Sequence, residues 1–267
     1  MSKKNKSQKV SGTKEWASAT ANCVTGCEHE CRYCYARYNM CDRFKKVAHG
    51  DWGNKKVRPW DVKKKRQKVD GAVMFPTTHD ICPSVLGECL EVIDNILSVG
   101  NDILIVSKPH LECIKAICDR FGSFKDKILF RFTIGSVNDE ILSYWEPGAP
   151  KFLERLKSLR FAFLEGFKTS VSCEPMLDGN NMIQLFLTLV PYVTDSIWIG
   201  KMNHIESRVR IENEEDRLAV EKIKAGQTDI CVNEIYEALK DETKVKWKES
   251  FKEVLGLELA TEIGQDI

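Results

Sequence analysis

Three cysteines in one short polar stretch carry the strongest chemical signal of the sequence. Cys27, Cys31 and Cys34 follow one another at intervals of four and three residues. This spacing allows three thiolates to converge on one metal cluster from a single loop. Iron–sulfur clusters normally take four cysteine thiolates, and no fourth is obvious here, so one iron would stay open, as catalytic metal centres require. We therefore predict that these three residues hold a [4Fe–4S] cluster.

A structural zinc site is the alternative for the same cysteines, with His29 or Cys41 as its fourth ligand. Thiolates and imidazoles also select zinc. Structural zinc sites usually show paired Cys-x-x-Cys knuckles, however, and only one dense group of cysteines is present. Cys23 and Cys41 flank this group without sharing its spacing, so we expect both to be structural.

The remaining composition indicates an intracellular enzyme more than a nucleic-acid or membrane protein. The chain has 267 residues, eleven cysteines and a formal net charge of +1. Residues 1–14 are polar and basic without an apolar stretch, so we expect a flexible tail and no secretion signal. A cytoplasmic, reducing location makes disulfides a poor explanation for the cysteines. A dedicated nucleic-acid binder would be more basic, and no apolar run reaches the roughly 20 residues that span a membrane.

Short apolar runs must position the chemical groups, and they alternate with amphipathic stretches. Such alternation predicts right-handed βαβ units and a parallel sheet. A closed eight-stranded barrel typically takes about 250 residues, so we predict a partial (β/α)6 TIM-type barrel over residues 15–205. The expected strands lie near residues 18–24 and at 72–75, 103–107, 128–134, 169–173 and 196–199, and the expected helices at 85–97, 111–121, 152–163 and 182–190.

Residues 206–267 are more charged and follow helical spacing. Helices are expected over residues 214–224, 232–239 and 244–255, the last with an apolar stripe that includes Val245, Trp247 and Phe251. We interpret this segment as a C-terminal helical extension packed on the barrel.

The string GCEHECRYCYAR, residues 26–37, resembles the radical S-adenosylmethionine (SAM) superfamily and, more specifically, its spore photoproduct lyase-like branch. Further similarity covers roughly residues 18–203 and includes the stretches 77–80, 107–108, 146–150, 172–176 and 200–203. The resemblance implies reductive cleavage of SAM to a 5′-deoxyadenosyl radical, which abstracts hydrogen from a substrate and triggers bond cleavage. It also implies a flavodoxin- or ferredoxin-type electron donor.

The resemblance assigns roles to polar residues at the carboxyl ends of the expected strands. Tyr33 would contact the adenine of SAM, Lys108 would pair with its carboxylate, and Thr133 would bond its ribose or methionine part. The full set of expected cofactor contacts is Tyr33, Thr78, Ser107, Lys108 and Thr133, and that of substrate contacts is His79, Asp80, Glu174, Lys201, Asn203 and His204. A turn cap at Asp80 and a structural ion pair at Glu174 are the simpler interpretations.

Two substrate classes remain open within this enzyme class. Asp80 and Glu174 suit a small donor-rich base, and we favour queuine, a modified deazapurine whose cleavage would give 7-aminomethyl-7-deazaguanine in queuosine salvage. Photoproduct repair or RNA modification is the alternative. Repair enzymes of this branch use a cysteine near the second strand end as a hydrogen-atom donor, and here only Cys82 is near.

Outside the enzyme class, the alternative is a non-catalytic iron–sulfur or zinc protein that binds RNA through the basic segment 55–68. That segment carries eight lysines and arginines, and it is either a solvated surface or a phosphate-contacting patch.

Overall fold

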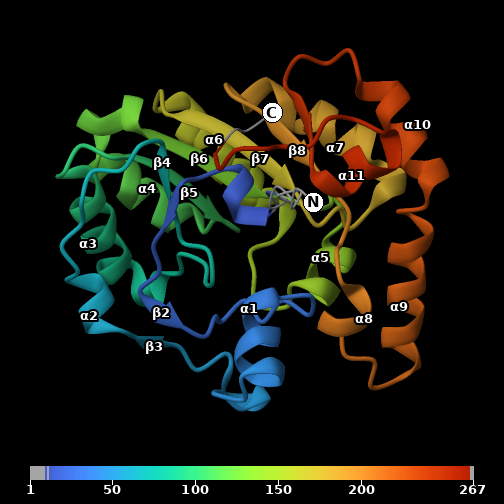
Figure 1. The fold of residues 1–267 in the computed structure, drawn as a ribbon, viewed down its shortest axis with the longest axis horizontal. Coiled ribbons are helices and arrows are strands. Elements are labelled where there is room, and N and C mark those ends of the chain that lie inside the picture. The colour runs from blue at the N-terminus through green and yellow to red at the C-terminus, as the bar shows by residue number, and fades with distance from the viewer. Residues whose placement is uncertain (1–9, 11, 265–267) are drawn as a thin grey trace, which may run out of the picture.

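Seven parallel strands form the central sheet of the protein, as shown in the computed structural model, which describes residues 10 and 12–264. Every neighbouring pair of strands runs parallel (Figure 1). The predicted partial TIM-type α/β fold is therefore confirmed. In the order of the sheet, the strands are β1 (Ala19–Thr20), β4 (Ala72–Phe75), β5 (Asp102–Ser107), β6 (Ile128–Thr133), β7 (Lys168–Cys173), β8 (Ile197–Ile199) and β9 (Val245–Trp247).

Helices fill the connections between the strands and cover the outer face of the sheet. A separate antiparallel pair, β2 (Val24–Thr25) with β3 (Lys56–Val57), lies at the end where α1 is found (Figure 1). The α-helices are α1 (Tyr35–Arg37), α2 (Pro59–Val62), α3 (Leu86–Leu97), α4 (Leu111–Arg120), α5 (Asp139–Trp145), α6 (Phe152–Leu164), α7 (Met182–Leu189), α8 (Ile205–Arg208), α9 (Glu214–Ala225), α10 (Asp229–Leu239) and α11 (Glu249–Leu255). Shorter helical turns are η1 (Gly12–Glu15), η2 (Tyr38–Arg43), η3 (His49–Asp51), η4 (Pro83–Val85), η5 (Gly122–Lys127), η6 (Gly179–Asn181) and η7 (Val190–Tyr192).

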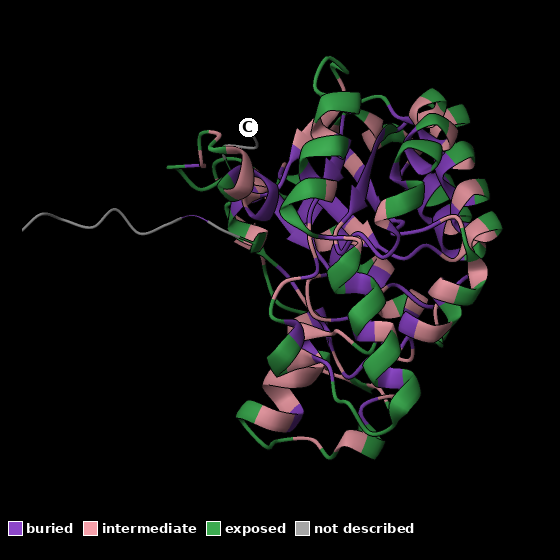
Figure 2. Ribbon diagram, turned by 90° about the vertical axis from the view of Figure 1, so that its right-hand side faces the viewer, coloured by how far each residue is buried: buried purple, intermediate pink, exposed green. Residues whose placement is uncertain are grey.

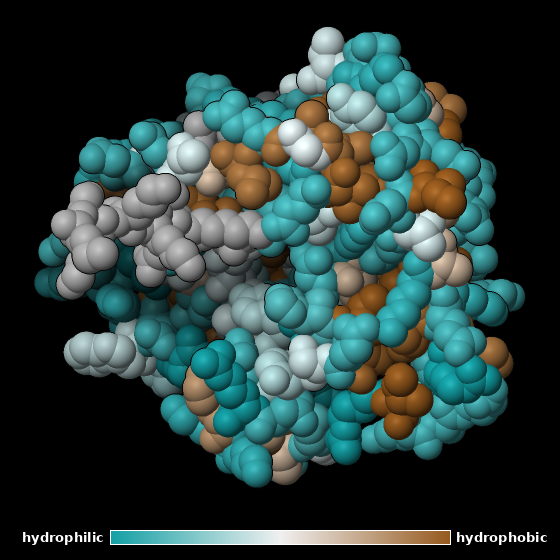
Figure 3. Space-filling model, turned by 45° about the vertical axis from the view of Figure 1, so that its right-hand side comes forward, coloured by the Kyte–Doolittle hydropathy of each residue, from teal (hydrophilic) through white to brown (hydrophobic). Residues whose placement is uncertain are grey.

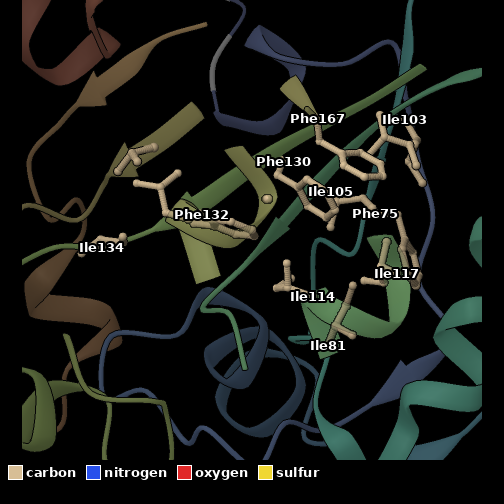
Figure 4. Close-up of a cluster of buried hydrophobic side chains, with 14 of the residues drawn as sticks. Phe75, Ile81, Ile103, Ile105, Ile114, Ile117, Phe130, Phe132, Ile134 and Phe167 are labelled. Carbon is tan, nitrogen blue, oxygen red and sulfur yellow. The ribbon is translucent and has the colours of Figure 1, made fainter. Parts of the chain in front are cut away.

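The main core lies between the outer face of the sheet and these helices. Alternate strand residues such as Phe75, Ile105 and Phe130 point to this side, where Ile114 and Ile117 of α4 meet them (Figure 4). The five side chains are 0% exposed, and full burial of one such side chain stabilises the fold by about 1.5–3 kcal/mol. The buried strands and the exposed outer surfaces of the helices are visible in Figure 2.

The inner face of the sheet is closed by the segment that precedes β1. Ala17 packs with Met74 and Leu104, and the Trp16 and Trp198 rings meet edge-on at 5.6 Å. The guanidinium of Arg131 lies 4.6 Å from the Trp16 ring. The inner face is therefore filled by side chains from the segment before β1 and from the middle of the strands, which leaves the carboxyl ends for the cysteine loop.

The structure differs from the expected elements at both ends of the sheet. The helix expected at 244–255 is a strand, β9, followed by α11, and β9 pairs with β8. The apolar stripe belongs to two elements. Val245 and Trp247 alternate as in a strand, whereas the apolar residues from Phe251 onward follow helical spacing. Of the expected first strand, Ala19–Thr20 joins the sheet as β1, whereas Val24 belongs to β2. Residues 12–14 of the expected tail belong to η1, and residues 1–9 and 11 lie outside the described part.

Most of the surface visible in Figure 3 is hydrophilic, with separate apolar patches. Exposed apolar side chains include Leu187 on α7 and Ile230 on α10. Among the described residues, none of the helices has the length and apolar character needed to cross a membrane.

Candidate functional site

The predicted cysteine loop connects β2 to α1 and is held from one side by the segment before β3. The Cys27 N–H donates to the Trp52 carbonyl at 3.0 Å. Gly26 has φ +90°, and a Cβ there would lie 2.6 Å from the same carbonyl oxygen, so only glycine fits. Cys34 caps α1 and accepts a hydrogen bond from the Arg37 N–H at 3.4 Å.

The turn between α5 and α6 holds the other side of the cysteine loop. The Gly148 N–H donates to the His29 carbonyl at 3.1 Å, and the Arg32 N–H donates to the Trp145 carbonyl at 2.9 Å. A Cβ on Gly148 would lie 2.0 Å from the Glu28 carbonyl oxygen. Residues 146–150, one of the stretches on which the family resemblance rests, therefore support the cysteine loop.

Of the three predicted ligands, Cys27 and Cys31 are buried and Cys34 is half-buried, and all three thiols are poorly stabilised as free thiolates. Burial raises the pKa of Cys27 to about 12, and it also raises the pKa values of Cys31 and Cys34. Within the described residues, the Cys31 thiol has no hydrogen-bond partner. Buried thiols of this kind become good ligands when a metal takes the place of their protons. The donor set therefore fits a metal cluster.

Asp80 connects the cysteine loop to the ends of two strands. Its Oδ2 accepts a hydrogen bond from His29 Nδ1 at 2.9 Å, and its Oδ1 accepts from Ser107 Oγ at 2.8 Å and from the Lys108 N–H at 2.7 Å. Burial would raise the pKa of Asp80, but Lys108 and His29 hold it well below its usual value. Both oxygens are thus engaged by protein groups, and Asp80 supports the loop through residues distant in sequence and not as the cap of a local turn.

Lys108 extends from this support toward the predicted ligands. Its Nζ lies 3.7 Å from Asp80 Oδ2 and 5.8 Å from the Tyr33 ring. Burial would lower the pKa of Lys108, but Asp80, Cys31 and Tyr33 hold it well above its usual value. The structure therefore keeps a buried ammonium group beside the cysteine loop, and its pairing with a SAM carboxylate stays a prediction.

The hydroxyl of Tyr33 contacts a buried ion pair, Glu146 with Arg155, that was not predicted from the sequence. Its hydroxyl donates to Glu146, whose Oε2 lies 2.5 Å from Arg155 Nη2. The side chains of Glu146 and Arg155 are both 0% exposed. Burial and the neighbouring Glu146 charge raise the pKa of Tyr33 well above its usual value, so the hydroxyl stays neutral. The ring is fixed next to the loop, where the predicted adenine contact would be.

The other predicted cofactor and substrate residues near β4 and β6 are mostly used within the protein. The Thr78 N–H donates to Asn22 Oδ1 at 2.8 Å. Thr133 is buried, and its carbonyl accepts from Arg155 Nη1 at 3.3 Å. His79 is also buried: its Nε2 accepts from the Cys23 N–H at 3.2 Å, and its Nδ1 lies 3.1 Å from the Asp80 carbonyl. With both ring nitrogens engaged, His79 has no free group for a substrate.

A second polar group gathers after β7 and β8. Glu174 Oε2 lies 3.5 Å from Lys248 Nζ, and burial raises the pKa of Glu174. Lys201 pairs with Asp229 of α10 at 3.3 Å. Asn203 and His204 have no side-chain hydrogen bond among the described residues, and His204, at φ +59°, is exposed. Glu174 is therefore paired, whereas Asn203 and His204 keep their polar groups unengaged.

Arg208 of α8 is a residue that the sequence analysis did not single out. Its guanidinium lies 5.9 Å from the Tyr35 ring and has no hydrogen bond or ion pair with any described residue. Burial lowers the pKa of Arg208, while the nearby Cys34 and Glu174 favour its charge. It follows the last strand of the expected barrel by several residues, so no strand-end pattern marked it.

The contacts of His29, Cys41 and Cys82 bear on the zinc and photoproduct-repair alternatives for the site. His29 directs its ring nitrogens at Asp80 and His110, and the Cys41 thiol donates to the Ala48 carbonyl at 3.9 Å. The Cys41 thiol is engaged by this carbonyl, whereas a ring nitrogen of His29, an Asp80 oxygen and the Cys27 thiol lie within 4.8 Å of one another. Cys82 is 0% exposed and packs against His29, so it is not placed as a hydrogen-atom donor to a bound substrate.

The basic segment 55–68 is largely tied to the protein. Lys55 bonds Glu28 and Ser84, and Arg58 bonds Asp61 as well as the Val24 carbonyl at 3.0 Å. Arg66 and Lys68 donate to backbone carbonyls. These contacts favour the solvated connector over the phosphate-contacting patch, although Lys63, Lys64 and Lys65 are exposed.

A partial barrel with three thiols on the loop near its carboxyl-end mouth is the arrangement that the resemblance implied. Among solved structures, a variant of spore photoproduct lyase superimposes with a TM-score of 0.54 at 14% identity, covering 91% of this chain and 79% of that one. A second variant, with bound AdoMet and dinucleoside spore photoproduct, gives a TM-score of 0.50 at 17% identity, covering 83% of this chain and 65% of that one. These likenesses confirm the resemblance at the level of the fold.

The comparisons of sequence are weaker. No protein-family model matches the chain. An uncharacterized protein, ORF301 of Acidianus two-tailed virus, is 27% identical over 173 residues, which make up 60% of this chain and 56% of that protein. The chain thus spans just over half the length of this viral relative.

Proposed function

We propose that the protein is a radical SAM enzyme whose cluster is held by Cys27, Cys31 and Cys34. The observation that carries the proposal is the placement of these thiols on one loop near the carboxyl ends of the parallel strands, beside the buried ammonium of Lys108. Active sites of TIM-type barrels form at this end of the strands. The solved structures with the same fold include one with bound AdoMet, which supports the same cofactor here.

The residues of the chain would bind and orient the cofactors in defined ways. When bound, the [4Fe–4S] cluster and SAM supply an electron and, after carbon–sulfur bond cleavage, a 5′-deoxyadenosyl radical that takes hydrogen from the substrate. Lys108 would face the SAM carboxylate, and Tyr33, fixed by Glu146, would flank the adenine. A flavodoxin- or ferredoxin-type protein would supply the electron.

The substrate is proposed from the polar groups that remain near the mouth. Arg208 and Glu174 place a cation and a carboxyl on the side of the mouth formed by β7 and α8. Asn203 would add an amide. A compact substrate with both donors and acceptors suits this set, and queuine remains the named candidate, cleaved by lyase chemistry to 7-aminomethyl-7-deazaguanine. Photoproduct repair has less support, since Cys82 is buried beside His29.

An anaerobic assay tests the enzyme class separately from the substrate. Purified chain is reconstituted with iron and sulfide, and 5′-deoxyadenosine is measured after addition of SAM and dithionite. We expect absorption near 400 nm and formation of 5′-deoxyadenosine, both lost in Cys27→Ala, Cys31→Ala and Cys34→Ala. Cys118→Ala is the matched control, because this buried cysteine lies on α4, away from the loop. A wild-type chain that holds one zinc and no iron at the three cysteines would contradict the proposal.

A second assay tests the substrate. Queuine is added to the active, reconstituted chain, and 7-aminomethyl-7-deazaguanine is measured by mass spectrometry. Formation of this product in wild type and its loss in Cys31→Ala would support queuine. If 5′-deoxyadenosine forms but this product does not, queuine is excluded and the enzyme class stands.

A further inference from the structure

Two histidines and one cysteine meet beneath the cysteine loop, where the proposed cluster chemistry does not use them. The Nε2 atoms of His29 and His110 lie 2.8 Å apart, and the Cys82 thiol lies 3.5 Å from His29 Nε2. One ligand atom from each of the three lies within 4.8 Å of the other two. His29 and Cys82 are 0% exposed, and the His110 side chain is 19% exposed.

These side chains come from three separate parts of the fold. His29 lies in the cysteine loop, Cys82 precedes η4 in the connection after β4, and His110 is the residue before α4, after β5. Thiolate and imidazole groups together are the donors that zinc prefers. A cation at their meeting point would tie the cysteine loop to the ends of two neighbouring strands.

The spacing of the ligand atoms is close to that of a tetrahedral zinc site. Zinc–nitrogen bonds of about 2.0–2.1 Å and zinc–sulfur bonds of about 2.3 Å place two nitrogens about 3.3 Å apart and a nitrogen and a sulfur about 3.5 Å apart. The sulfur–nitrogen distance of 3.5 Å already agrees. The two imidazoles, at 2.8 Å, need to separate by roughly half an ångström.

Each imidazole also has a carboxylate on its far side. His29 Nδ1 donates to Asp80 Oδ2 at 2.9 Å, and His110 Nδ1 lies 3.9 Å from Glu154 Oε1. Metal-binding histidines commonly donate their second ring N–H to a carboxylate, which orients the ring and directs the other nitrogen at the metal. With Nδ1 of His29 protonated toward Asp80, its Nε2 carries the lone pair that a metal needs.

We propose that His29, Cys82 and His110 bind one zinc ion, separate from the [4Fe–4S] cluster. Binding displaces the proton of the Cys82 thiol to solvent and moves the ring proton of His110 to Nδ1, facing Glu154. A water molecule or Glu28, whose carboxylate contacts the Cys82 thiol, completes the tetrahedron. The ion would fasten the loop that carries the cluster ligands to the connections after β4 and β5.

The test measures zinc and iron in the same sample. Untagged chain is purified anaerobically, reconstituted with iron and sulfide, incubated with zinc chloride, desalted and analysed for both elements. We expect one zinc per chain in wild type and in Cys118→Ala. The Cys82→Ala and His110→Ala variants should bind no zinc and should bind as much iron as wild type does.

X-ray absorption at the zinc edge identifies the ligands without any variant, which matters if the alanine variants fail to fold. The expected spectrum has one sulfur neighbour and three nitrogen or oxygen neighbours, two of them from imidazole rings. Wild-type chain with its iron but no stoichiometric zinc, or zinc bound by sulfur atoms alone, would overturn the site. Because iron is read separately, absence of zinc would leave the radical SAM proposal standing, and absence of iron would not affect the zinc result.

Discussion

The Asp80 carboxylate accepts a 2.9 Å hydrogen bond from His29 Nδ1, which fixes the middle of the cysteine loop to the connection after β4. The same carboxylate is the nearest counter-charge of the buried Lys108. Loss of its charge would therefore loosen the loop and leave the ammonium without compensation.

Asp80→Asn should lower the free energy of unfolding by about 3–5 kcal/mol, as removal of one partner of a buried ion pair does. Iron bound after reconstitution should fall with it. Urea unfolding and iron analysis give the two values. Asp94→Asn is the control: its pair with Arg120 is exposed on both sides, so we expect a change of about 0–1 kcal/mol. Equal effects of the two substitutions would contradict this role of Asp80.

Loss of the buried ion pair of Arg155 and Glu146 should destabilise the fold as much as loss of the Asp80 charge does. Arg155→Met leaves the Glu146 charge unpaired at a fully buried position, so we expect a loss of about 3–5 kcal/mol in urea unfolding. Arg160→Met changes an exposed arginine of the same helix and should change stability by less than about 1 kcal/mol. An effect of Arg155→Met as small as that of Arg160→Met would show that the ion pair with Arg155 is not needed to keep Glu146 buried beside Tyr33.

Two glycine substitutions should act in opposite directions. Gly148→Ala brings a Cβ to 2.0 Å from the Glu28 carbonyl, so it should push the cysteine loop away, reduce iron binding and destabilise the fold by about 1–3 kcal/mol or more. Gly87→Ala in α3 meets no atom within 4 Å and should stabilise by about 0.4–1 kcal/mol. Thermal unfolding and iron analysis of both variants measure the contrast, and a normal iron content in Gly148→Ala would contradict the supporting role of the turn.

The stability of the fold should depend on pH through Glu15. Burial, followed by the hydrogen bond with Glu249, raises the pKa of Glu15 from 4.5 to about 8, although Lys248 lies 3.1 Å away. Between these pH values the folded chain holds a proton that the unfolded chain has released. The contribution of Glu15 to the free energy of unfolding is therefore complete below pH 4.5 and is lost as the pH rises through about 8.

The measurement compares wild type with Glu15→Gln in urea at pH values from 5 to about 9. Wild type should lose more stability across this window, because the glutamine cannot ionise. Glu91→Gln, on the exposed side of α3, should retain the wild-type pH dependence. Parallel curves for wild type and Glu15→Gln would show that Glu15 does not titrate in this range.

The sequence predicted the strands because most of them are buried on both faces and therefore read as short apolar runs between helices. It missed β9, where three strand residues run directly into the helical spacing of α11. The spacing of Cys27, Cys31 and Cys34 predicted one loop, since three ligands close in sequence need no tertiary information to converge.

The sequence could not show which way the side chains at the strand ends turn. Asp80 and His79 are neighbours at the end of β4, yet Asp80 supports the cysteine loop and His79 bonds the backbone of Cys23. Position along a strand gives the end of the sheet at which a residue lies, whereas its partners depend on which loops pack there. Arg208 was missed for the same reason, since its neighbours come from distant segments.

The contact of Glu15 with Lys248 joins residues more than two hundred positions apart, and Lys248 directly follows β9, which pairs with β8. During synthesis, the segment around Trp16 leaves the ribosome long before Lys248 exists, so Glu15 lacks this contact while the middle strands assemble. The last strand of the sheet and the contact of Lys248 with Glu15 therefore form late, and ribosome-bound chains that stop at residue 205 should remain open to proteases near Trp16.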